Sequence, residues 1–138
     1  DLRHESTHAL LHATLPEVPL WLDEGLAEYF EMSELDRAYH HPHLATLRWN
    51  ARLGMFRTVE SLEERQEVGE MGSSEYRFAW SWVHFMLHGP VAAHRTLVDY
   101  LADIRRGDQA GPLSKRLRAA IPDLDARMER HIGSWRQA

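Results

Sequence analysis

The chain has 138 residues, enough for one hydrophobic core but not for two, so we expect a single domain spanning residues 1–138. An apolar share of 43% and a charged share of 27% are typical of a globular protein, while a net charge of −5 without a basic cluster argues against a nucleic-acid partner. No apolar run is long enough for a membrane span, and the absence of cysteine excludes disulfides and a thiolate metal site.

The first predicted element is a helix over residues 1–14, which contains His4-Glu5-Ser6-Thr7-His8, the pattern H-E-x-x-H. Residues four apart lie one turn apart on the same face of a helix, so both imidazoles can point at one metal ion. Glu5 lies beside that face, where it can take a proton from a metal-bound water. Because the chain has 10 histidines, the short pattern can also arise by chance. Two ordinary histidines on a half-buried helix are therefore the alternative.

Pro16 and Pro19 predict a turn, after which a second helix is expected over residues 20–33. It contains Trp21-Leu22-Asp23-Glu24-Gly25-Leu26-Ala27-Glu28-Tyr29-Phe30, with apolar residues at the helical period. If the two helices pack with a tight return between them, Glu24 can reach an ion held by the first. Gly25 is unfavourable inside a helix, and we expect it to allow a close approach of these two helices.

Together the two segments resemble the gluzincin metallopeptidases, in which W-L-N-E-G-x-A follows H-E-x-x-H and its Glu is the third zinc ligand. They resemble most closely the peptidase MA-like bacterial families of poorly characterised function. The resemblance covers about the first thirty residues strongly and the later helices faintly. It implies that His4, His8 and Glu24 bind zinc, that Glu5 is the general base, and that the substrate is a peptide or protein. It also implies a thermolysin-like helical lobe whose sheet lies upstream of this chain, which we then expect to be a fragment.

The same resemblance bears on Glu28, which follows Glu24 by one turn. A ligating histidine usually donates its other ring N–H to a carboxylate, and related enzymes have an acid at this position. We therefore predict that Glu28 accepts a hydrogen bond from His4 or His8; a plain surface acid is the alternative. Asp23 has a shorter side chain and is expected to point elsewhere.

Residues 35–43 are polar and include His40, His41 and His43, which predicts a solvated loop, with adventitious metal binding by these histidines as the alternative. Proline and glycine residues then separate further helices, which we expect over residues 42–54, 59–65, 73–88, 91–106, 112–120 and 122–135. The stretch from 55 to 73 is expected to be a mobile connection apart from its short helix. Since no convincing strand is found, the predicted fold class is all-α.

The helix over residues 73–88 carries Tyr76, Trp80, His84 and His88 at every fourth position. The segment around Tyr76 resembles, faintly, the helix from which gluzincin aminopeptidases stabilise the oxyanion through a tyrosine. Tyr76 is therefore a candidate catalytic residue, with His84 as the competing donor and a simply packed tyrosine as the alternative.

These expectations combine into a zinc metallopeptidase that hydrolyses peptide bonds with a metal-activated water and Glu5 as general base. The alternative function is a non-catalytic, zinc-stabilised helical module that binds a partner. Glu5 argues against it, because a purely structural metal site needs no base.

Overall fold

The computed structural model describes residues 2–15, 17–34, 36–37 and 41–134. Within these residues every regular element is a helix and no strand occurs, which confirms the predicted all-α class. The elements are α1 (Leu2–Thr14), α2 (Leu20–Glu31), α3 (His43–Arg52), α4 (Val59–Glu63), the 3-10 turn η1 (Val68–Glu70), α5 (Ser73–His88), α6 (Val91–Arg105), α7 (Leu113–Ala120) and α8 (Leu124–Ser134). None of the helices in this part of the chain combines the length and the apolar character needed to span a bilayer.

Proline residues define where several helices begin. Pro19, Pro42, Pro90 and Pro112 directly precede α2, α3, α6 and α7, where a proline costs no helical hydrogen bond. The helices accordingly lie where the proline and glycine positions predict them. The short helix expected over residues 59–65 is present as α4, where Val59 and Leu62 are completely buried and tie it to the core.

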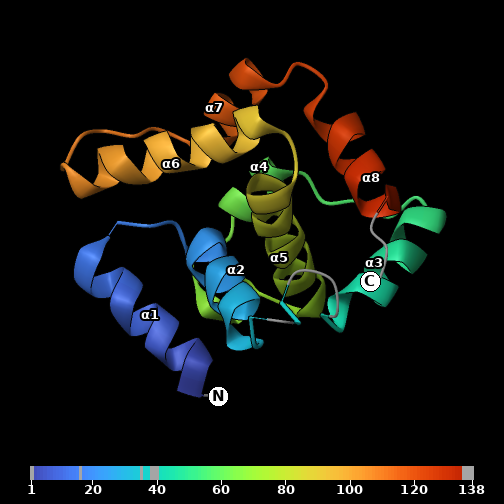
Figure 1. Cartoon of the computed structure of the whole chain (residues 1–138), viewed down its shortest axis with the longest axis horizontal. Coiled ribbons are helices and arrows are strands. Elements are labelled where there is room, and N and C mark those ends of the chain that lie inside the picture. The colour runs from blue at the N-terminus through green and yellow to red at the C-terminus, as the bar shows by residue number, and fades with distance from the viewer. Residues whose placement is uncertain (1, 16, 35, 38–40, 135–138) are drawn as a thin grey trace.

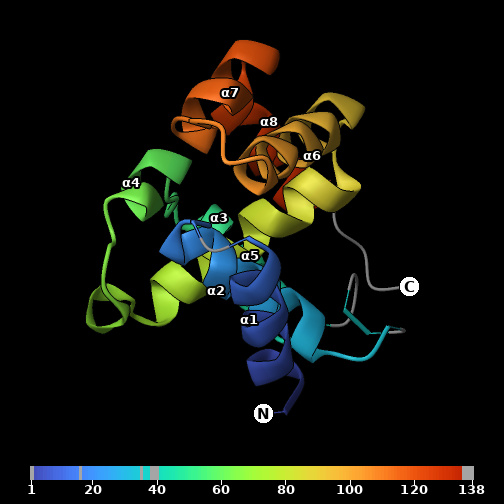
Figure 2. The same cartoon turned by 90° about the vertical axis from the view of Figure 1, so that its left-hand side faces the viewer.

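The core forms around α5, which lies in the middle of the molecule with α2 on one side and α6, α7 and α8 above and beside it (Figure 1). Most side chains of α5 from Phe78 to Met86 are buried, and they meet the buried face of α2, which includes Trp21, Leu22 and Leu26. α1 packs on α2 and lies in front of it in the second view (Figure 2). The central helix therefore positions α2, and α2 in turn positions α1.

Gly25 marks the closest approach between α2 and α5. A Cβ atom added at this position would lie 2.8 Å from the carbonyl oxygen of Ala79 and 2.9 Å from Cγ2 of Val83. The close approach predicted for Gly25 is therefore present, but its partner is α5 and not α1. Because the neighbour is main chain, it cannot move aside easily, and α2 is held rigidly against the core.

Replacing Gly25 by alanine is expected to destabilise the protein by about 1–3 kcal/mol, because overpacking against α5 outweighs the roughly 1 kcal/mol gained in helix propensity. Gly133 in α8 is a matched control, since an added Cβ atom there meets nothing within 4 Å. Gly133→Ala should stabilise slightly. Urea unfolding of both variants measures the difference, and equal stabilities would show that the contact with Ala79 does not limit packing.

α1 is the least buried of the packed helices. None of the side chains of residues 2–13 is fully buried, and Leu2 and Leu10 are 83% and 66% exposed. These apolar side chains of α1 therefore face solvent. The opposite face of α1, with His4, His8 and Leu11, is partly buried.

Candidate metal centre

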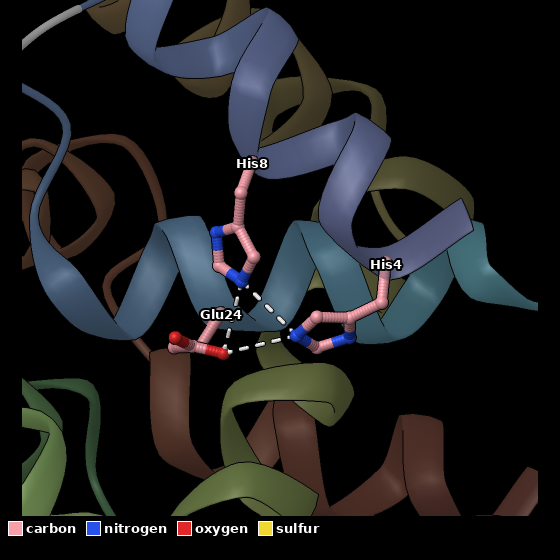
Figure 3. A group of neighbouring side chains, drawn as sticks. All are labelled: His4, His8 and Glu24. Carbon is pink, nitrogen blue, oxygen red and sulfur yellow. Dashed lines mark hydrogen bonds and ion pairs between the residues drawn. The ribbon is translucent and has the colours of Figure 1, made fainter. Parts of the chain in front are cut away.

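The structure brings His4, His8 and Glu24 together between α1 and α2 (Figure 3). The Nε2 atoms of His4 and His8 are 3.0 Å apart. Oε2 of Glu24 lies 3.4 Å from the first and 3.3 Å from the second. The three atoms thus form a nearly equilateral triangle, with both imidazoles and the carboxylate turned toward one point.

These distances fit a tetrahedral zinc ion. Zinc bonds to His nitrogen and carboxylate oxygen at about 2.0–2.2 Å, which places neighbouring ligand atoms of a tetrahedron about 3.3 Å apart. The observed sides of 3.0, 3.3 and 3.4 Å match one face of such a tetrahedron. Two histidines and one glutamate are also a donor set that catalytic zinc sites use, with a fourth position left for water or substrate.

The second ring nitrogen of each histidine is occupied by a carboxylate. Nδ1 of His8 lies 2.9 Å from Oδ1 of Asp23, and Nδ1 of His4 lies 3.2 Å from Oε2 of Glu31. Such contacts keep the proton on Nδ1, so that Nε2 offers a lone pair to a metal. The other oxygen of Asp23 lies 2.8 Å from Nε2 of the exposed His12. Sequence reasoning missed both carboxylates, and the expectation that Asp23 points elsewhere is wrong.

The prediction that Glu28 supports a ligand histidine is also wrong. Its Oε2 lies 2.6 Å from Nε2 of His43, at the start of α3. Burial alone would raise the pKa of Glu28, but the hydrogen bond and charge of His43 lower it overall. His41, expected in a solvated loop, is only 4% exposed and stacks on Trp80; His40 lies outside the described residues.

Two further groups of His and carboxylate side chains come close together: His8, His12 and Asp23, and Glu28, His41 and His43. Their N–O contacts of 2.6–2.9 Å are hydrogen bonds, shorter than the separation of zinc ligands. In the second group, Nδ1 of His41 accepts a hydrogen bond from the main-chain N–H of His43 at 3.1 Å. Nε2 of the neutral His41 ring therefore carries the proton and offers no lone pair. The group of His4, His8 and Glu24 is the better metal site.

Negative charge surrounds His8. Burial alone would lower the pKa of His8, but the hydrogen bond to Asp23 and the charges of Asp23, Glu24 and Glu5 raise it overall. The same carboxylates that favour a proton on the ring also favour a metal cation between the histidines.

Glu5 is exposed and lines a cavity of about 720 Å³ together with His8, His12, Asp23 and Glu24. The predicted base therefore faces the same space as two of the three candidate ligands. A molecule in this cavity would contact both Glu5 and the candidate metal site.

The two candidates on α5 lie in different surroundings. The pKa of Tyr76 is raised, first by burial and then by the charges of Glu24 and Glu28, which places its hydroxyl within electrostatic reach of Glu24. His84 is completely buried, and its Nδ1 lies 2.9 Å from Nε2 of His131 on α8. The structure therefore removes His84 as an oxyanion donor, whereas Tyr76 stays a prediction.

Replacing Asp23 by alanine is expected to weaken zinc binding by about 10–100-fold, because the His8 ring loses the carboxylate that orients it. Glu28→Gln serves as the control on the same helix and should bind zinc as the wild type does. Competition with a chromogenic chelator measures both affinities. Equal affinities of Asp23→Ala and wild type would show that Asp23 does not support the site.

The fold and the site define an all-α domain in which two adjacent helices present two histidines and a glutamate to one point. The family described as "Protein of unknown function (DUF1570)" matches residues 1–107, and the chain belongs to this family. The match spans α1 to α6 and includes the whole His–His–Glu group. No curated protein and no solved structure matches the chain.

Proposed function

We propose that this protein is a zinc-dependent metallopeptidase of the gluzincin type, with His4, His8 and Glu24 as the zinc ligands. The observation that carries the proposal is the triangle of donor atoms, whose sides of 3.0–3.4 Å match zinc coordination without any rearrangement. The carboxylates that contact the Nδ1 atoms of the two histidines also support the proposal. Asp23 and Glu31 hold His8 and His4, respectively, in the tautomer that binds a metal through Nε2.

A zinc ion held by these residues would supply a Lewis acid and lower the pKa of a bound water toward about 7. Glu5 follows His4 directly and faces the cavity, so it takes the proton of the attacking water and returns it to the leaving amine. Tyr76, which lies within electrostatic reach of Glu24, is the candidate for donating a hydrogen bond to the negative charge that would develop on the scissile carbonyl. Peptide as the substrate class rests on the resemblance to gluzincins.

The exposure of Glu5 in the cavity favours catalysis over a purely structural zinc site. A structural site has four protein ligands and needs no proton acceptor. Here only three protein donors converge, so the fourth position of a zinc ion would stay open for water or substrate. Glu5 is the carboxylate beside this position that can accept a proton.

Metal analysis and a peptidase assay test the proposal directly. Protein purified without a histidine tag should contain close to one zinc ion per chain, and His8→Ala should contain almost none. Wild-type protein should cleave a mixed peptide library, lose this activity with a chelator and regain it with zinc. One zinc ion per chain without any cleavage would instead support the zinc-stabilised binding module, and absence of zinc would contradict both functions.

A further inference from the structure

The cavity beside the candidate zinc ligands has an apolar wall as well as an acidic one. Besides the polar groups described above, it is lined by Ala9, Val18, Leu20 and Val68. These residues come from three separate stretches: α1, the start of α2 with the turn before it, and η1. Apolar side chains from distant parts of the sequence thus meet next to Glu5, His8 and Glu24.

Val18 and Leu20 are partly buried and pack against the hydrophobic core. One side of each residue is therefore fixed by the core, while the other side faces the cavity. Because the core holds these two side chains in place, this wall of the cavity keeps its shape when water is displaced. It can therefore accept an apolar group without rearrangement.

Val68 lies on a turn that its neighbours hold in place. Oε1 of Glu70 accepts hydrogen bonds from the main-chain N–H groups of Gln66 and Glu67 at 3.2 and 3.1 Å. Met71, which follows the turn, is buried at 8% exposure and anchors it to the core. Val68 itself is 58% exposed and lines the cavity. The turn thus presents an apolar side chain to the candidate site from a fixed position.

The acidic wall limits which substrate side chains fit. Glu5 and Asp23 line the same cavity, so two carboxylates make this side of it acidic. An acidic substrate side chain is repelled by these carboxylates and gains nothing from the apolar wall.

We propose that Val18, Leu20 and Val68 form the subsite for an apolar substrate side chain next to the cleaved bond. The protein then selects peptides with a leucine-sized residue at this position over peptides with alanine, and most strongly over peptides with aspartate. This inference rests on the proposed metallopeptidase function, and names the substrate class for that site.

Hydrolysis of a peptide series that differs only at this residue tests the subsite. Wild-type protein should favour leucine over alanine by about 10–100-fold in kcat/KM, the range for a few methylene groups in an apolar pocket. Val68→Asp should reduce this preference, and Val68→Lys should raise the relative rate of the aspartate peptide. The control is Val98→Asp, since Val98 is 50% exposed on α6 and does not line the cavity. A Val68→Asp variant with unchanged preference would overturn the subsite.

A binding measurement separates this inference from catalysis. Hydroxamates bind zinc directly, so a hydroxamate with an isobutyl group can be compared with acetohydroxamate on zinc-loaded protein by calorimetry. The isobutyl compound should bind at least tenfold more tightly, and Val68→Asp should remove this gain while acetohydroxamate binds as before. If this pattern is found without any peptide cleavage, the subsite is supported and the peptidase function is wrong. If peptides are cleaved but neither series discriminates, the function stands and the subsite is wrong.

Discussion

Glu5→Gln is expected to reduce peptide hydrolysis by about 10²–10⁴-fold, the usual contribution of a general base, while zinc content stays at the wild-type level. Glutamine has the shape of glutamate but cannot take up a proton. Glu5 is not one of the three donors that converge between α1 and α2, and its side chain is exposed. Its replacement therefore changes neither the zinc ligands nor the packing, and the free energy of unfolding should shift by less than about 0.5 kcal/mol.

Steady-state kinetics, zinc analysis and urea unfolding of the same preparation measure these three quantities. Glu129→Gln is a suitable control, because Glu129 is also an exposed acid on a helix but lies on α8. It should retain full activity. A Glu5→Gln variant that hydrolyses peptides at the wild-type rate would show that another group accepts the proton.

Acid is expected to destabilise the fold strongly between pH 6.5 and pH 4. Burial, together with the charge of a neighbouring histidine in each case, lowers the pKa of His41 and of His131 from the usual 6.5 to about 4. In this range the unfolded chain binds protons that the folded chain does not, so stability falls as the pH decreases and levels off below about 4. Each residue contributes up to about 3 kcal/mol to the loss.

The contact between His84 and His131 gives this effect a structural cause. Their ring nitrogens are 2.9 Å apart, so one donates and the other accepts, and a second proton breaks the link between α5 and α8. Urea unfolding at several pH values, with a chelator present throughout, measures the loss without interference from metal release. His131→Gln should remove about half of the pH dependence. The same change at His94, which is exposed on α6, should leave it as it is, since that ring is in solvent in both states. A flat stability profile in the wild type would contradict the assigned pKa values.

The helices and the three candidate metal donors could be predicted because their signals are local. Pro19, Pro42, Pro90 and Pro112 fix the starts of four helices by ring geometry alone. The spacing of His4 and His8 requires only one helical turn to bring two rings together. The prediction of Glu24 as the third donor needed one further assumption, namely that the chain turns tightly between the first two helices.

The carboxylates behind the histidines could not be predicted, since they depend on which side of Glu24 faces α1. With about 100° per residue, Asp23 and Glu31 lie on one side of Glu24 around α2, and Glu28 lies on the other. α1 packs on the first side, so Asp23 and Glu31 meet the histidines. Glu28 instead meets His43, which returns from 15 residues further along the chain. The prediction of His84 as an oxyanion donor is wrong for a related reason, because its partner His131 lies 47 residues away on α8.

In the proposed metallopeptidase, the exposure of α1 would tie catalytic competence to metal supply. This helix carries two of the three donors and Glu5, yet none of the side chains of residues 2–13 is fully buried. An ion between His8 and Glu24 would act as a reversible cross-link that closes the loop between them, so metal binding and docking of α1 become one equilibrium. Amide hydrogens of α1 would then exchange more slowly as zinc rises, while those of α5 follow global unfolding. The base and the ligands would then be held in place most firmly in the loaded protein.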